Sequence, residues 1–123
     1  MKIVAIGLLL ALTACTTTQT DNAKNQVAAM ESALAAAETL AAAYVNLPTC
    51  TGTGTQICSN ASIIATVGKS DGIAYAAIVA AQKTVDDVSA TAGSINQAVT
   101  AASDALTAFQ SIVQALPQKQ VQQ

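Results

Sequence analysis

The chain lacks the side chains on which most catalytic and nucleic-acid-binding sites depend. Its 123 residues include no His, no Arg and no Trp, and only 10% of them are charged. Without His the common general base is missing, and without Arg there is no bidentate clamp for carboxylate or phosphate groups. The net charge is −2 and no basic run is present, which argues against nucleic acid as a partner. We therefore expect no enzymatic activity, no catalytic residues and no cofactor.

Long hydrophobic runs are also scarce, and the longest lies at the N-terminus. Met1 and Lys2 precede the apolar run Ile3–Ala14, which is too short to serve as a permanent membrane span of about 20 residues. It has the length of the apolar region of a signal peptide and ends in small residues. Its end, Leu12-Thr13-Ala14-Cys15, resembles the lipobox of bacterial lipoproteins. An ordinary signal peptide with a Cys near its cleavage site is the alternative.

The lipobox resemblance implies where the protein lives and how it is held there. Cleavage would remove residues 1–14 as a signal peptide, Cys15 would carry acyl groups, and residues 15–20 would form a short polar tether. Thr16 stands where the inner-membrane retention signal of these lipoproteins usually has Asp. The resemblance therefore implies a lipid anchor in the outer membrane, facing the periplasm, with the membrane itself as a partner.

Cysteine is rare, and its number fits this interpretation. Once Cys15 is used for lipid, Cys50 and Cys58 remain as an even pair. Exported proteins keep disulfides because their compartment is oxidising, and the intervening Gly- and Thr-rich segment is flexible enough to close. A tetrahedral metal site is not expected, because there is no His and no further Cys to complete it. We predict a Cys50–Cys58 disulfide and no metal site.

Alanine dominates the apolar residues and favours helices. An amphipathic helix is predicted from Asp21 to Leu47, ended by Pro48. Its apolar stripe recurs at alternating steps of three and four: Val27, Met30, Leu34, Ala37, Ala41 and Tyr44. A loop follows to residue 59, and Ser59 or Asn60 is predicted to cap a short helical turn through Val67. The segment GKSDG, residues 68–72, predicts a break and a new helix start.

After this break an apolar residue recurs in a strict four-three spacing for about six heptads, which is typical of a coiled-coil seam. The seam comprises Ala74, Ile78, Ala81, Val85, Val88, Ala92, Ile95, Val99, Ala102, Leu106, Phe109, Val113 and Leu116. Pro117 ends it, and residues 117–123 form a polar tail. A Gly93 cap followed by a Ser94–Gln97 capping box divides this stretch into two helices. We predict an all-α fold for residues 21–116, a small Ala-rich three-helix antiparallel bundle. The alternative is one helix plus a long coiled-coil-like helix over 71–116.

Three other patterns suggest chemistry but have simpler interpretations. Asp86 and Asp87 are adjacent on a helix and diverge, so we expect a solvated face. Asp71 beside Lys69 is expected to be a helix cap and its neighbour. The TGTGT segment, residues 51–55, lacks the spacing of a phosphate-binding loop and is interpreted as a flexible loop.

These observations favour a non-enzymatic, outer-membrane-anchored lipoprotein with a structural or protein-interaction domain. The heptad seam is the candidate surface for self-association or for an envelope partner. Wall-linked lipoproteins also have an Ala-rich heptad helix but end in Lys, whereas Gln123 stands last here. The alternative is a phage- or plasmid-encoded membrane effector, either the outer subunit of a spanin pair or a superinfection-exclusion lipoprotein. Outer spanins are often proline-rich, and this chain has two prolines. A carrier of apolar ligands ranks lowest, because Ala-lined helix interfaces leave little cavity.

Overall fold

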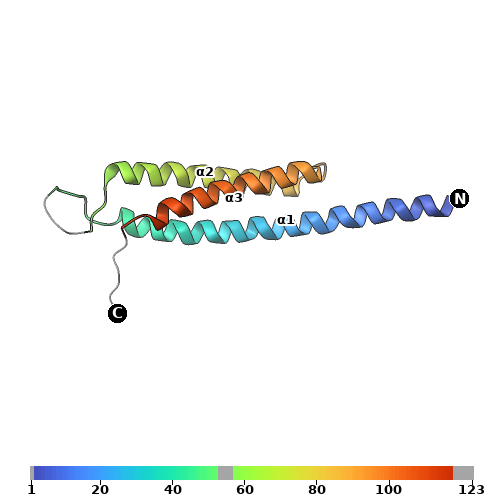
Figure 1. Cartoon of the computed structure of the whole chain (residues 1–123), viewed down its shortest axis with the longest axis horizontal. Helices are drawn as coiled ribbons and strands as arrows, with labels where there is room; N and C mark the ends of the chain where they lie inside the picture. Colours follow the sequence, from blue (N-terminus) through green and yellow to red (C-terminus); the bar gives the residue numbers. More distant parts are fainter. Residues whose placement is uncertain (1, 53–56, 118–123) are drawn as a thin grey trace, which may run out of the picture.

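The chain forms three helices that pack as an up–down–up bundle (Figure 1). The computed structural model describes the backbone of residues 2–52 and 57–117, and the side chains of these ranges from Gln19 onward. Helix α1 spans Lys2–Val45, α2 spans Ala61–Asp86 and α3 spans Ala92–Gln114, and each contacts the other two. The predicted three-helix antiparallel bundle is confirmed. The alternative of one long helix over 71–116 is wrong.

The core lies along the three helices where the apolar stripes meet. Phe109 is fully buried and Tyr44 nearly so, and these two aromatic rings are accompanied by buried alanines and aliphatic side chains. Small side chains let the helix backbones approach closely, which is how a chain poor in large apolar residues still closes a core. The buried set is Ala23, Val27, Leu34, Ala37, Ala41, Tyr44, Val67, Ala74, Ile78, Ala81, Val85, Ile95, Ala102, Leu106, Phe109, Val113 and Leu116.

Helix α2 is continuous where the sequence predicts a break. Asn60 is its N-cap, as expected, and its side chain accepts a hydrogen bond of 2.8 Å from the Ser62 N–H. The helix then runs through residues 68–72 without interruption, so the predicted break there is wrong. Val67 and Ala74 are buried on either side of the two glycines. Their packing outweighs the cost of about 1 kcal/mol that each glycine adds to a helix interior.

The turn between α2 and α3 lies at residues 87–91, ahead of the predicted turn at Gly93. The Asp87 side chain accepts a hydrogen bond of 2.8 Å from the Ser89 N–H, and Thr91 caps α3 by accepting one of 3.1 Å from Ser94. Side-chain acceptors that bind nearby N–H groups stabilise a turn without requiring glycine. Val88, predicted in the seam, therefore lies fully exposed in this turn.

At the N-terminus, α1 begins at Lys2 and crosses the whole predicted signal and tether region. The backbone of residues 15–20 is helical, in place of the short polar tether that the sequence suggests. The division of the chain at residues 14 and 20 stays a prediction. Pro117 follows the helical domain as expected, and residues 118–123 of the predicted polar tail lie outside the described residues.

Candidate interaction surface

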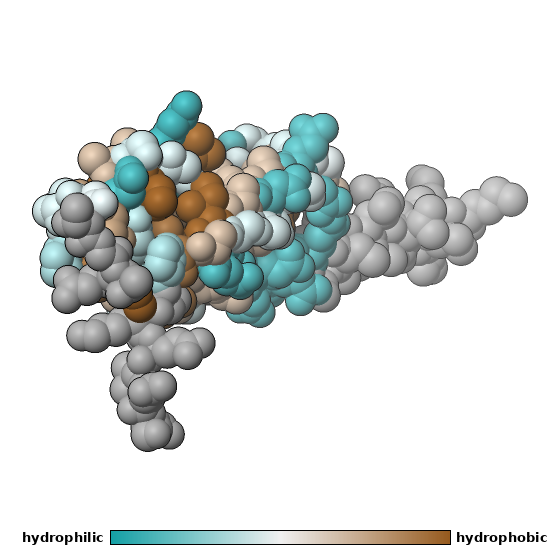
Figure 2. All heavy atoms as spheres, turned by 60° about the vertical axis from the view of Figure 1, so that its left-hand side comes forward, coloured by the Kyte–Doolittle hydropathy of each residue, from teal (hydrophilic) through white to brown (hydrophobic). Residues whose placement is uncertain are grey.

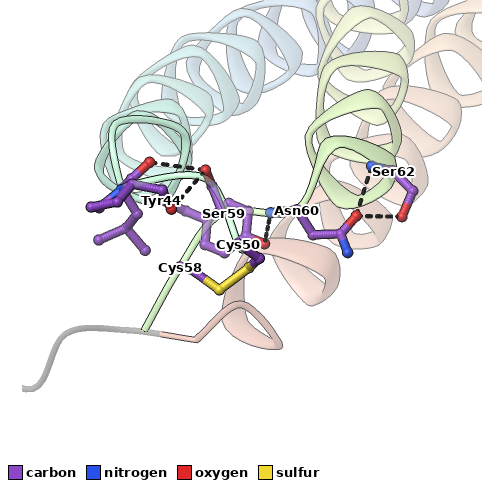
Figure 3. Close-up of a disulfide and its surroundings, with 8 residues drawn as sticks. Tyr44, Cys50, Cys58, Ser59, Asn60 and Ser62 are labelled. Atoms are coloured by element: carbon purple, nitrogen blue, oxygen red, sulfur yellow. Dashed lines mark hydrogen bonds between the residues drawn. A yellow bond between two sulfur atoms is a disulfide. The ribbon is translucent and has the colours of Figure 1, made fainter. Parts of the chain in front are cut away.

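The loop between α1 and α2 is held together at one end of the bundle (Figure 3). Cys50 and Cys58 form the predicted disulfide, with their Cα atoms 5.0 Å apart. Next to it, Thr49 and Ser59 form a short parallel bridge. The Cys50 N–H donates to the Ser59 carbonyl at 3.0 Å, and the Ser59 N–H donates to the Pro48 carbonyl at 2.9 Å. The base of the loop is thus fixed by one covalent link and two backbone hydrogen bonds.

Two side chains tie this base to the helices (Figure 3). The Ser59 hydroxyl is buried and donates to the carbonyl of Leu47 at 2.9 Å, just after the end of α1. The Tyr44 hydroxyl oxygen accepts a hydrogen bond of 2.9 Å from the Asn60 N–H at the start of α2. Because Tyr44 is 2% exposed, its ring fixes the helix junction from inside the core. The base of the loop is therefore fixed to both α1 and α2.

A groove opens between α1 and α2 close to this loop end. It encloses about 220 Å³, and its lining includes Phe109 of α3. Gly68 and Ala42 contribute little side-chain volume, which leaves the space between the two helices open. We call this the α1–α2 groove; its lining residues are Glu38, Ala41, Ala42, Val45, Ile64, Val67, Gly68, Asp71 and Phe109.

Two carboxyl groups border the groove, one from each helix. Burial and the nearby Asp71 carboxylate raise the pKa of Glu38 above its usual value. One oxygen of Asp71, Oδ1, is buried and has no hydrogen-bond partner among the described residues. Within the part of the chain that the structure describes, the ion pair is Lys24–Asp86, so neither of these carboxylates is matched by a cation. The groove is an apolar hollow with unbalanced negative charge at its rim.

Apolar side chains are exposed beyond the groove. Figure 2 shows hydrophobic residues gathered toward the loop end and hydrophilic residues toward the opposite end of the bundle. Among the described residues, the large apolar side chains that are exposed are Leu40, Val45, Ile57, Ile73, Tyr75 and Val88. Tyr75 is 60% exposed, unlike buried Tyr44. Leu40, Val45 and Ile57 lie toward the loop end, Ile73 and Tyr75 midway along α2, and Val88 in the α2–α3 turn.

The opposite end of the bundle is polar. Lys24 and Asp86 lie 3.3 Å apart, and Gln19 donates to Asn96 at 3.4 Å. The side-chain hydrogen bond from Gln82, followed by that from Lys24, lowers the pKa of Asp86, while hydrogen bonds from Ser89 lower that of Asp87. A shallow hollow of about 300 Å³ here has a lining that includes Asp21, Asp86 and Asp87. Asp86 and Asp87 are exposed, as the sequence predicts, but each also has a local hydrogen-bond partner.

The predicted site residues lie in different places. Cys50 and Cys58 are joined at the loop end, whereas the Cys15 side chain lies outside the described residues. Most of the predicted heptad seam packs inside one chain, so its buried residues are not displayed to a partner. Asp71 lies within α2 and faces Glu38, so its predicted role as a helix cap is wrong. The Glu38–Asp71 pair was not foreseen, because the sequence does not reveal which helix faces meet.

Comparison with known proteins adds no assignment to this geometry. No protein-family model matches the chain, and no curated protein or solved structure matches it significantly.

Proposed function

We propose that the protein is a non-enzymatic lipoprotein, anchored in the outer membrane through Cys15, whose helical domain binds other proteins in the periplasm. The lipobox at residues 12–15 supports the anchor, and Thr16 supports the outer membrane. The absence of His and Arg from the sequence supports a role in binding rather than catalysis. An open groove with exposed apolar side chains is suited to contact with another protein.

The observation that carries this proposal is the continuity of α1. One helix runs from Lys2 past Cys15 into the bundle, and residues 19–24 lie beside the α2–α3 turn. The loop between α1 and α2 lies at the other end of the same helix (Figure 1). The disulfide closes this loop, and the α1–α2 groove lies next to it. An anchor at Cys15 therefore directs the polar end toward the membrane and the groove away from it.

The anchor is tested by the mass of the protein extracted from membranes. We expect an N-terminal Cys15 carrying diacylglycerol and an amide-linked acyl chain, and recovery in the outer-membrane fraction of a density gradient. Cys15→Ser should lose the acyl mass and leave that fraction. The paired variant Cys50→Ser, Cys58→Ser is the matched control, since it removes two cysteines and their disulfide but keeps the lipobox. Wild-type protein without acyl mass would contradict the anchor.

The binding role is tested separately, by photo-crosslinking in intact cells. A crosslinking residue is placed at Val45, beside the groove, or at exposed Asp104 on α3 as a control. We expect specific crosslinked products from position 45 and none from position 104. Equal products from both positions, or none from either, would contradict a binding surface at the groove.

A further inference from the structure

Helix α2 is apolar and is only partly covered by the other two helices. In the described part of the chain it is the one helix long and apolar enough to cross a membrane by length and composition. Only 17% of its most apolar window is buried in the bundle. The charged Lys69 and Asp71 lie midway along it, which is costly in a bilayer. A protein partner, with charges that match these, suits this face better.

We propose that two copies of the chain pack in parallel through this face of α2, about a twofold axis along the bundle, each Lys69 entering the α1–α2 groove of the other copy. The groove rim carries the Glu38 and Asp71 carboxyl groups without a cation from the described residues. Lys69 is exposed and has no ion pair with the residues that the structure describes. The chain thus carries both halves of a complementary contact.

Helix geometry explains why Lys69 does not fill its own groove. An α-helix turns by about 200° over two residues, so Lys69 and Asp71 lie on opposite flanks of α2. Asp71 is on the flank next to α1, where it meets Glu38. When two parallel copies are related by a twofold axis along the helices, the Lys69 flank of one lies against the Asp71 flank of the other. The ion pair then forms twice.

The apolar residues follow the same register. Ile73 lies one turn after Lys69, and Tyr75 lies one turn after Asp71, on the corresponding flanks. They are 54% and 60% exposed. At about 100° per residue Tyr75 lies closer to the centre of the contact than Asp71, whereas Ile73 lies further from it than Lys69. In the parallel arrangement Tyr75 is therefore the apolar side chain that adjoins each ion pair. An antiparallel pair would instead place like flanks together and bring the two Lys69 ammonium groups to the same side.

The two helices can approach closely between these flanks. A Cβ atom added at Gly68 or Gly72 would meet nothing within 4 Å, so the surface over both glycines is open. Helices that cross at small residues bring their backbones near each other, which shortens the path from Lys69 to the opposite groove. The parallel direction is also that of two chains anchored by their N-termini in one membrane. That last point alone rests on the proposed function.

Charge reversal tests the contact in purified full-length protein in detergent, by sedimentation equilibrium. Lys69→Glu and Glu38→Lys should each raise the dimer dissociation constant by roughly tenfold or more, because like charges then face each other. The two changes combined should restore the dimer to near the wild-type value. Lys69→Arg and the exposed-acid control Asp104→Lys should retain it. A monomeric wild type, a combined variant as weak as the single ones, or equal loss with Asp104→Lys would overturn the proposal.

Two further measurements keep the test independent of folding and of the anchor. Gly72→Leu should abolish the dimer while the circular dichroism spectrum stays helical, since the monomer has room for the side chain. A dimer that survives Gly72→Leu would overturn the close approach. A chain that instead binds phosphatidylcholine vesicles and inserts α2, with the charge variants inert, would overturn the proposal in favour of lipid. A dimer without acyl groups would contradict the proposed anchor but not the dimer. An acylated monomer would contradict the dimer but not the anchor.

Discussion

The hydroxyl oxygen of Tyr44 near the C-terminal end of α1 accepts a 2.9 Å hydrogen bond from the N–H of Asn60, the N-cap of α2. This single contact joins the end of one helix to the start of the next across a loop of fifteen residues, 46–60. It also explains why a Tyr rather than a Phe occupies a core position that is 2% exposed. Buried Tyr hydroxyls generally need such a partner.

Removal of that hydroxyl should weaken the bundle. Tyr44→Phe leaves the Asn60 N–H without its acceptor, and we expect a loss of about 1 kcal/mol in the free energy of unfolding, measured with urea. Tyr75→Phe is the matched control, because Tyr75 is 60% exposed and should change the value little. Equal losses from the two variants would show that the hydroxyl of Tyr44 has no special role.

The Cys50–Cys58 disulfide should contribute about 2.5 kcal/mol to the free energy of unfolding. It joins two residues that are 8 apart in the sequence and so restricts the unfolded chain. Replacing both cysteines with Ala should lower the unfolding free energy by that amount, and reduction of the wild type should lower it equally. The Ala variant itself should be insensitive to reductant, which isolates the bridge from other effects. A reductant-sensitive Ala variant would mean that something else responds.

The position of the α2–α3 turn can be checked by two substitutions near it. Thr91 caps α3, so Thr91→Ala should cost about 1 kcal/mol. Gly93 lies inside the first turn of α3, and an added Cβ would meet only Thr91 Oγ1 at 3.9 Å. Gly93→Ala should therefore stabilise the fold by about 0.5–1 kcal/mol, as expected for a glycine within a helix. Destabilisation by Gly93→Ala would indicate a turn at Gly93 instead.

Substitution by Ala should stabilise the fold at the two glycines of α2 and destabilise it at Gly52 of the loop. Gly68→Ala and Gly72→Ala should each stabilise the monomer by about 0.5–1 kcal/mol, because the space around them is open and the backbone is helical. Gly52 has φ +81°, which disfavours a side chain, so Gly52→Ala should destabilise by about 1 kcal/mol. Thermal unfolding of the three variants at low protein concentration measures this contrast.

The raised pKa of Glu38 makes stability depend on pH. Because the folded chain holds this proton more tightly than the unfolded chain, the unfolding free energy is greatest with Glu38 protonated. It falls as the pH rises from the usual pKa of 4.5 through the raised folded value. Glu38→Gln should remove this slope and add less than about 1 kcal/mol at neutral pH, since the group is solvent-screened. Glu31→Gln, two turns earlier and exposed, is the matched control for the loss of one carboxyl group.

Apolar periodicity predicted most of the core, because the side chains that recur every three or four residues are those that pack inside. Val27, Leu34 and Tyr44 on α1, and Ile78, Leu106 and Phe109 beyond the loop, are all buried as that pattern predicts. The alternating steps of three and four residues identify the apolar face of each helix. That face is buried in a helix bundle just as it is in a coiled coil. The helix count and the antiparallel arrangement came instead from the capping signals at Gly93 and Ser94, and from the need of an Ala-rich seam to be covered.

The helix ends are harder to predict, because the glycines of this chain lie inside helices while side-chain caps mark the ends. The heptad phase continues through the turn at residues 87–91, so spacing alone did not locate that turn. Asp87 and Thr91 mark it by hydrogen bonds that form only once the turn exists. The Glu38–Asp71 pair depends on how α1 and α2 are rotated against each other, which no single-helix pattern contains.

The unbroken course of α1 has a mechanical consequence. From Cys15 to Val45 the helix rises about 45 Å, with no hinge between the proposed acyl anchor and the groove. A flexible spacer would allow the domain many distances from the bilayer, whereas a continuous helix would hold it at one distance. The groove would then reach only partners whose binding sites lie at that distance from the membrane. Lengthening α1 by whole turns would move the groove away from the membrane in steps of about 5 Å.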